Sequence, residues 1–295
     1  MFGFFSSNLI TVVDGIAFGV LLFTIALGLS LVFGVMDVLS LAHGSLYLIG
    51  SYIAVSVSTA FTPTLGFFVL ALVLAVALGS LAGAGLSFLT RPLASRGHLD
   101  QALLTLGVAF VVGDLLAQQY GREVRTVAPP SPFDGSVSVF GSTYPTYRLV
   151  IIAVGLALAI AAYLVIERTK MGALVQATVA DAQMVRALGV NTGRLMTGVF
   201  AVGAALAAFG GVLGAPILNA APGLDNRVLI LGLVVVVIGG LGSVAGAFVG
   251  ALVIGQVQTL GVSLAPSYAA FLTFGAMALV LLLRPAGILG KGRLA

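Results

Sequence analysis

Long stretches without a charged side chain dominate this sequence and limit what it can fold into. Five runs contain no Lys, Arg, Asp or Glu: Gly15–Met36, Val38–Thr90, Leu149–Ile166, Leu195–Leu224 and Val228–Leu283. A helix that crosses a bilayer needs about 20 mainly apolar residues, and each run is near that length or a multiple of it. In the whole chain 7% of residues are charged, against roughly 25% in soluble domains. The pattern predicts a chain embedded in lipid.

A helical bundle fits these runs better than a β-barrel. Inside a bilayer the backbone must satisfy its own hydrogen bonds, which leaves helices or closed barrels. Barrel strands alternate apolar and polar side chains, whereas Leu149–Ile166 and Ile230–Ile238 are apolar on every face. We therefore predict an all-α polytopic membrane protein of about 8–9 transmembrane helices, folded as a single transmembrane domain over residues 1–295. The N-terminus has no positive charge before its apolar stretch, so we expect a first span there and no cleaved signal peptide.

Polar segments separate the expected spans. The first six helices are expected at Thr11–Phe33, Val38–Ala60, Leu65–Leu89, Gln101–Gln118, Arg148–Ile166 and Leu195–Leu218. Residues 120–147 carry four prolines among Ser and Gly, which predicts a loop outside the bilayer. Residues 167–194 form a charged segment between the fifth and sixth spans.

The basic residues predict an orientation. Residues 91–100, residues 167–194 and the C-terminal tail are expected on one face, because even numbers of crossings separate them. That face holds nine basic residues: Arg91, Arg96, Arg168, Lys170, Arg186, Arg194, Arg284, Lys291 and Arg293. The other face holds four: Arg122, Arg125, Arg148 and Arg227. The positive-inside rule makes the first face cytoplasmic, which puts residues 120–147 and the N-terminus outside and the C-terminus in the cytoplasm.

The last apolar run, Val228–Leu283, does not divide into simple spans. Glycines interrupt it at residues 239–246, and Gly261–Pro266 interrupts it again. Its first piece, Val228–Ile238, is too short to cross a bilayer. We expect a broken or re-entrant Gly-rich helix pair followed by one full span, Tyr268–Leu283. Broken helices at membrane depth occur where they are buried in protein or line a cavity, which indicates a translocation path.

Motifs for catalysis are sparse. The two histidines, His43 and His98, have no carboxylate or second histidine at metal-ligand spacing. The sequence has no Gly-x-Ser-x-Gly elbow, no phosphate-binding loop ending in Gly-Lys-Ser/Thr, and no cysteine. We expect a protein that is no enzyme and holds no metal or cofactor, so that any ATP hydrolysis is supplied by separate subunits.

A few polar residues lie in or near the predicted spans, where charge is costly. Asp14 and Asp37 are expected at the two interfaces of the first span, where a carboxylate stays hydrated. Asp114 lies deeper in the fourth span, and both a structural partner and a role in a path fit it. His43 is expected one turn into the second helix, where a lone histidine more often hydrogen-bonds between helices than binds a ligand. The small residues near it suit either close packing or a wet cavity.

The segment at residues 167–194 is too large for a turn and too small for a domain. Residues Gln176–Leu188 have a helix-forming composition, bounded by Gly172 and Gly189. We expect one short amphipathic helix, which either docks into a groove of a partner or lies at the membrane interface.

Five short motifs follow one another from about residue 25 to the end of the chain. They are Leu41–Gly44 with Gly50–Tyr52, Arg91–Leu93 with Leu103–Gly107, Arg168–Gly172 with Asp181 and Leu188–Asn191, Ile238–Ala247, and Arg284–Ile288. Together they resemble the branched-chain amino acid ABC transporter permeases, in particular their LivH-like subunit. The chain departs from that pattern at Ser40, where the family has asparagine, and at Ala173 and Gln176, where it usually has arginines.

The resemblance implies a permease subunit of an ATP-binding cassette importer for branched-chain or related hydrophobic amino acids in the inner membrane. Its partners would be a second, LivM-like permease subunit, two cytoplasmic ABC ATPase subunits, an extracytoplasmic substrate-binding protein and membrane lipid, with no nucleic acid. Two alternatives stay open. One is the same machine with urea, amides or other amino acids as cargo. The other is a stand-alone secondary transporter or channel, with Asp114 as its ion-coupling carboxylate.

The resemblance also assigns residues to roles. Coupling to the ATPases is expected at Arg168, Gly172, Asp181, Arg186, Leu188 and Gly189. The translocation path is expected near Ser40, His43, Gly44, Asp114, Gly239, Gly240, Gly242 and Ser243.

Overall fold

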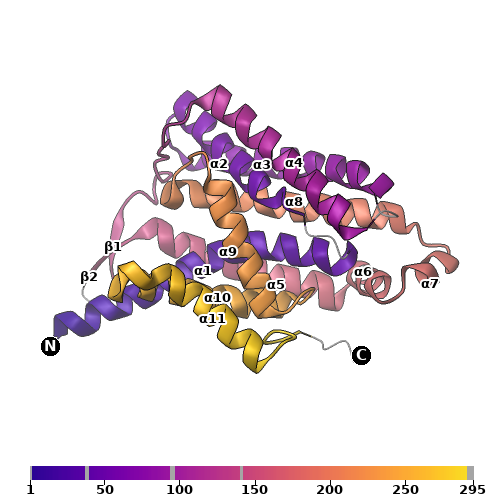
Figure 1. The fold of residues 1–295 in the computed structure, drawn as a ribbon. Coiled ribbons are helices and arrows are strands. Elements are labelled where there is room, and N and C mark those ends of the chain that lie inside the picture. The colour runs from indigo at the N-terminus through magenta and orange to yellow at the C-terminus, as the bar shows by residue number, and fades with distance from the viewer. Residues whose placement is uncertain (1, 37–39, 94–96, 140–141, 291–295) are drawn as a thin grey trace.

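Long helices with short connections make up most of the chain (Figure 1). The computed structural model describes residues 2–36, 40–93, 97–139 and 142–290. The helices are α1 Phe2–Met36, α2 His43–Ala60, α3 Leu65–Thr90, α4 His98–Tyr120, α5 Thr146–Arg168, α6 Lys170–Ala180, α7 Ala182–Ala187, α8 Thr192–Leu218, α9 Leu224–Gly239, α10 Val244–Leu264 and α11 Ala269–Leu283. The described residues also form two 3-10 turns, Arg91–Leu93 and Pro266–Tyr268, and an antiparallel hairpin of β1 Ser136–Val139 and β2 Ser142–Pro145. Asp37, Arg96, Lys291 and Arg293 lie outside the described residues.

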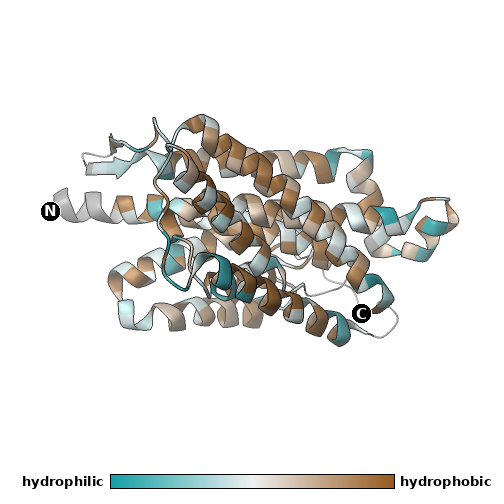
Figure 2. Cartoon of the chain, turned by 90° about the horizontal axis from the view of Figure 1, so that it is seen from above, coloured by the Kyte–Doolittle hydropathy of each residue, from teal (hydrophilic) through white to brown (hydrophobic). Residues whose placement is uncertain are grey.

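Seven of the described helices are long and apolar enough to cross a membrane. Apolar residues fill the middle of the bundle, and hydrophilic residues gather toward its two ends (Figure 2). These observations confirm the prediction of a helical, multi-pass membrane protein. The seven do not include α2, which carries His43 and several serines, or α9, which has 16 residues.

Several sequence predictions of element position were wrong. The first helix begins at Phe2 and not at Thr11. The second helix begins at His43 and not at Val38, because residues 40–42 form a turn in which His43 N donates to Ser40 O at 3.3 Å. Helix α9 begins at Leu224, before the charged residues that we had used to separate two spans. Residues 120–147 are not all loop, since β1 and β2 pair within them.

Small residues let the central helices approach closely. Helices α1 and α8 are mostly buried, whereas α3, α4, α5 and α11 are mostly exposed. A methyl group added at Gly50 of α2 would overlap the backbone of Ala208 in α8, and one at Gly28 of α1 would overlap Gly203. In lipid, where the hydrophobic effect does not hold helices together, such close contacts provide much of the association energy. Helix α8 is therefore the centre of the bundle.

The two ends of the bundle differ. The hairpin and the start of α1 lie at one end, and α6 and α7 project from the other (Figure 1). At the hairpin end, Tyr144 Oη donates to Asp14 Oδ1 at 2.8 Å, and Arg148 forms an ion pair with the same carboxylate. Burial raises the pKa of Tyr144, and its hydrogen bond to Asp14 raises it further. The phenol therefore stays protonated and ties β2 to α1.

Candidate functional site

The projecting segment is held at a fixed corner against α5. Thr169 is extended and caps α6, with its Oγ1 accepting from Gly172 N at 3.2 Å. Any side chain at Gly172 would overlap the backbone of Ile166. Gln176 Nε2 also donates to Ile166 O at 3.3 Å. The start of α6 is thus packed tightly against the end of α5.

The single helix predicted over Gln176–Leu188 is wrong, because the chain breaks at Asp181. This residue is extended (φ −155°, ψ 95°), and its Oδ1 accepts from Gln183 N and Met184 N, both at 2.9 Å. Such caps satisfy amides that a helix start leaves unbonded. The carboxylate therefore ends α6 and starts α7.

Glycine ends α7. Gly189 has φ +85°, a conformation that glycine adopts without strain. Its N–H donates to Arg186 O at 3.0 Å, and Val190 N donates to Val185 O at 3.3 Å. This pair of bonds is the Schellman arrangement of helix C-termini. Thus Gly172, Asp181 and Gly189 shape the predicted coupling segment.

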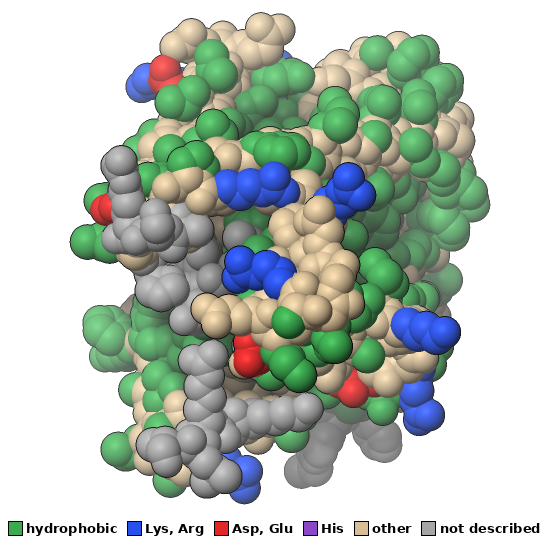
Figure 3. All heavy atoms as spheres, turned by 90° about the vertical axis from the view of Figure 1, so that its right-hand side faces the viewer, with side chains coloured by type: hydrophobic (Ala, Val, Ile, Leu, Met, Phe, Trp, Pro, Cys, Tyr) green, Lys and Arg blue, Asp and Glu red, His purple; other side chains and the backbone are tan. Residues whose placement is uncertain are grey.

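The side chains that α6 and α7 present are apolar and basic. Met184 and Leu188 are 58% and 71% exposed, and Arg168 and Arg186 are exposed beside them. Figure 3 looks onto this end, where Lys and Arg side chains are spread among apolar ones. Within α7, Val185 is buried and holds the helix to the bundle. Such a surface suits contact with another molecule.

Arg91 links the end of α3 to the start of α8 through hydrogen bonds. Its Nη2 donates to Gly193 O at 2.8 Å and to Thr197 Oγ1 at 2.5 Å, both in α8. Its guanidinium also lies over the Phe88 ring, 4.5 Å from the centroid. Asn191 caps α8 by accepting from Arg194 N at 3.0 Å. These contacts tie the end of α3 to the start of α8, the helix that follows α7.

The predicted path residues of α2 are buried at its start. His43 is fully buried, and neither of its ring nitrogens, nor Ser40 Oγ, has a hydrogen-bond partner in the described part of the chain. Each buried polar group left unsatisfied costs about 1–3 kcal/mol, so such groups mark water sites or functional strain. Leu41 N donates to Thr105 Oγ1 at 3.1 Å, which fixes this turn to α4.

The start of α2 meets the start of α9. A methyl group at Gly44 would overlap Asp225 O and crowd Leu229 Cβ. Asp114 of α4 faces the same region. Its Oδ2 accepts from Gln118 Nε2 at 2.7 Å, and it lines a cavity of about 310 Å³ together with Asp225. The structure thus brings Gly44 and Asp114 to one helix start.

Sequence reasoning missed Asp225, which is 8% exposed. Two features of the sequence mark it. A glycine, Gly223, precedes it, and a long apolar run follows it, which together form the pattern of an acidic first turn.

The Gly-rich residues form a corner at the opposite end of α9. The backbones of Gly239 and Gly246 touch, and Gly240 and Gly242 have φ of +102° and +76°. Ser243 caps α10, with its Oγ accepting from Gly246 N at 3.0 Å. The corner lies against Gly34 of α1 and residues 286–290. Helix α9 therefore joins the two groups of predicted path residues.

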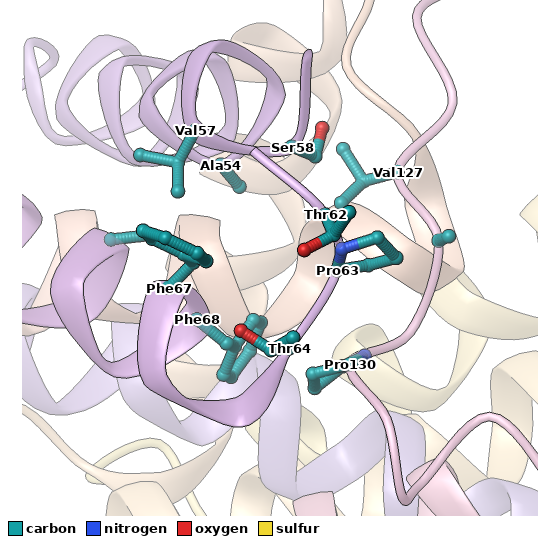
Figure 4. Close-up of a pocket in the computed structure, with 12 residues that line it drawn as sticks. Ala54, Val57, Ser58, Thr62, Pro63, Thr64, Phe67, Phe68, Val127 and Pro130 are labelled. Carbon is teal, nitrogen blue, oxygen red and sulfur yellow. The ribbon is translucent and has the colours of Figure 1, made fainter. Parts of the chain in front are cut away.

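A second hollow lies between α2, α3 and the loop at residues 127–130 (Figure 4). Phe67 and Phe68 point into it, with Pro63 and Pro130 across from them. Its volume is about 20 Å³, little more than one water needs. It is too small for an organic substrate.

Comparison with known proteins agrees with this architecture. The family model described as branched-chain amino acid transport system permease component matches residues 11–282. The permease protein BraD of Pseudomonas aeruginosa is 29% identical over 290 residues, covering 95% of this chain and 94% of that protein. The permease protein LivH of Escherichia coli K12 is 30% identical over 299 residues, covering 94% of each. A probable LivH of Methanocaldococcus jannaschii is 27% identical and covers 92% of this chain.

Each of these relatives is named as a permease of branched-chain amino acid transport. No solved structure matched the chain with comparable significance. The family match spans nearly all the described helices, from α1 to α11. The chain therefore belongs to the LivH-like branched-chain amino acid transport permeases.

Proposed function

We propose that this chain is one permease subunit of an ATP-binding cassette importer that moves branched-chain amino acids across the inner membrane. The observation that carries the proposal is the rigid α6–α7 projection, which exposes Met184, Leu188 and Arg186 at one end of a membrane-embedded bundle. The sequence contains no nucleotide-binding motif, so ATP must be hydrolysed by other subunits. Two cytoplasmic ATPases would bind this projection.

The projection transmits movement in this proposal. Substrate binding alone cannot bias a transport cycle, because a ligand shifts an equilibrium only by its differential affinity for the two states. Closure of the ATPases on ATP would displace α7. The Gly172 corner and the Gly189 turn would carry that displacement into α5 and α8.

The proposed path follows α9. It runs from Ser40, His43, Gly44 and Asp114 at the start of the helix to Gly239, Gly240, Gly242 and Ser243 at its end. Two short helices, α2 and α9, meet at Gly44, as expected where broken helices surround a substrate. With these two, the seven spanning helices make about nine membrane-embedded helices, of which α9 is the re-entrant one.

The proposed orientation follows the basic residues. The α6–α7 end, with Arg91, Arg168 and Arg186, is cytoplasmic, and the hairpin end is extracytoplasmic. A second, LivM-like permease would cover exposed helices of the bundle, and a substrate-binding protein would deliver cargo at the hairpin end. This arrangement leaves the N-terminus outside and the C-terminus in the cytoplasm.

The test is reconstitution of the chain in proteoliposomes with its permease, ATPase and binding-protein partners. We expect uptake of L-leucine that requires both ATP and the binding protein, and no uptake when an ATPase that cannot hydrolyse ATP is used. Accumulation of leucine against a gradient by this chain without any ATPase would refute the proposal and support a secondary transporter.

A further inference from the structure

The cavity at the start of α9 carries charges of both signs. It lies between α2, α4 and the turn that leads into α9. The lining residues are Leu48, Ala109, Phe110, Gly113, Asp114, Ala117, Arg122, Pro222, Gly223, Asp225 and Asn226. Its volume of about 310 Å³ is at the lower end of the range for small-molecule pockets, roughly 300–1,000 Å³. It therefore has room for a small organic molecule.

Asp225 is the buried charged group of this cavity. It is 8% exposed and lies in the first turn of α9, and its Oδ2 lies 3.7 Å from the position that a Cβ on Gly113 of α4 would take. Its carboxylate makes no hydrogen bond or ion pair with any residue that the structure describes. A carboxylate on a mostly buried residue is stabilised by a partner of opposite charge. The positive end of the helix stabilises that carboxylate only in part. A cationic group in the cavity would supply the missing partner.

Asp114 and Arg122 add the remaining charges. Asp114 uses Oδ2 to accept from Gln118, which leaves Oδ1 available. Arg122 lies two residues after the end of α4, and its guanidinium has no hydrogen bond or ion pair within the described ranges. An inorganic cation would gain from the two carboxylates but be repelled by the guanidinium. A simple carboxylate ligand would be attracted by the guanidinium but repelled by the two carboxylates.

Apart from Asn226, the other side chains that line the cavity are apolar. They include Leu48 of α2 and Ala109, Phe110 and Ala117 of α4. An aliphatic side chain gains free energy by burying its apolar surface against such walls. The cavity therefore offers anionic, cationic and aliphatic contacts within one small volume.

The geometry points to this cavity as a binding site for the zwitterion of an aliphatic α-amino acid. Its ammonium would face Asp225 and Asp114, its carboxylate would face Arg122, and its side chain would lie on Leu48 and Phe110. This inference rests on the proposed function and deepens it, because it adds Asp225 and Arg122 to the path. Since Gly44 touches the backbone of Asp225, a molecule bound in the cavity would also affect the packing at the start of α2.

The direct test is equilibrium binding of tritiated L-leucine to the purified complex in nanodiscs, with permeases and ATPases present and the binding protein absent. We expect saturable binding that weakens at least tenfold in Asp225→Asn and in Arg122→Gln. A tenfold change in Kd corresponds to about 1.4 kcal/mol. Asp134→Asn makes the same chemical change at an exposed carboxylate outside the cavity, and it should bind leucine as the wild type does.

Two competitors separate the contacts that the zwitterion makes. Leucinamide keeps the ammonium but lacks the carboxylate, and 4-methylpentanoate keeps the carboxylate but lacks the ammonium. Asp225→Asn should reduce competition by leucinamide, and Arg122→Gln should reduce competition by 4-methylpentanoate. If either residue had a purely structural role, its replacement would not selectively weaken competition by one of the two compounds.

Two outcomes would overturn the inference. One is that the wild-type complex shows no saturable binding of leucine. The other is that the Asp225→Asn and Arg122→Gln variants both bind leucine as the wild type does. If the complex with Asp225→Asn fails to assemble, leucine binding is measured instead in two other variants. These are Asp225→Glu, which keeps the charge, and Arg122→Gln. ATP-driven uptake with the binding protein present tests the proposed function separately. Uptake without cavity binding would refute this inference alone, whereas no uptake would refute the proposed function.

Discussion

Replacing Asp181 separates the two ways in which a carboxylate could serve the α6–α7 projection. Its Oδ1 accepts two backbone hydrogen bonds at 2.9 Å, from Gln183 and Met184. Alanine removes both, whereas asparagine removes the charge and keeps an acceptor of the same size. Loss of such a cap costs about 0.5–2 kcal/mol, typically about 1, and 1 kcal/mol shifts a two-state equilibrium about fivefold. Because α7 has six residues, that cost falls on the whole helix.

The assay is the number of ATP molecules hydrolysed for each leucine imported, measured in proteoliposomes. We expect Asp181→Ala to raise this ratio severalfold and to speed protease cleavage within α7, while Asp181→Asn stays close to the wild type in both. If Asp181→Asn is as impaired as Asp181→Ala, the charge itself contacts the ATPase and the capping explanation is refuted. If both variants behave like the wild type, α7 does not carry the coupling.

Four further substitutions test the contacts that hold the bundle together. Gly83→Ala should lower the melting temperature in detergent because its methyl group would meet the α8 backbone, whereas Gly85→Ala, which faces open space, should raise it slightly through the gain in helix propensity of roughly 0.5–1 kcal/mol. Arg91→Lys keeps the charge but loses the paired bonds to α8, so it should lower the melting temperature while topology mapping stays unchanged. Tyr144→Phe should cost about 1 kcal/mol. Since the pKa of Tyr144 is raised in the folded state, its contribution is complete below the ordinary tyrosine pKa of about 10 and declines as the pH rises through the folded value. The variant should therefore show less alkaline destabilisation in thermal scans than the wild type.

The spanning helices could be predicted from the sequence because the requirement for apolar length is local. The runs around Leu65–Leu89 and Leu195–Leu218 appear as α3 and α8 with boundaries close to those predicted. The Gly-rich corner was also visible, since glycines interrupt the run after Ile238. What could not be predicted is which glycines touch which helix. That Gly50 meets Ala208 follows from the crossing of α2 and α8, and residue spacing alone does not specify that crossing.

The missed features share a physical cause. Asp181 was expected inside one helix over Gln176–Leu188, and Asp225 was used only to mark the limit of an apolar run. Each is the acidic residue of a helix start, where its carboxylate meets free backbone amides or the positive helix end. Reading acidic residues as possible helix starts would have split α6 from α7 and moved the start of α9 to Leu224.

Helix length gives independent support for the proposed path. At 1.5 Å per residue, the 16 residues of α9 extend about 24 Å, less than the roughly 30 Å of hydrocarbon in a bilayer. In the proposed path, one end of α9 would therefore lie within the apolar layer. The end that carries Asp225, Asn226 and Arg227 is the polar one, and such residues are tolerated at that depth only where protein or a water-filled cavity surrounds them. The cavity at the start of α9 is thus a consequence of a helix too short to reach both surfaces, and the same shortness brings the buried carboxylate of Asp225 to the place where cargo would pass.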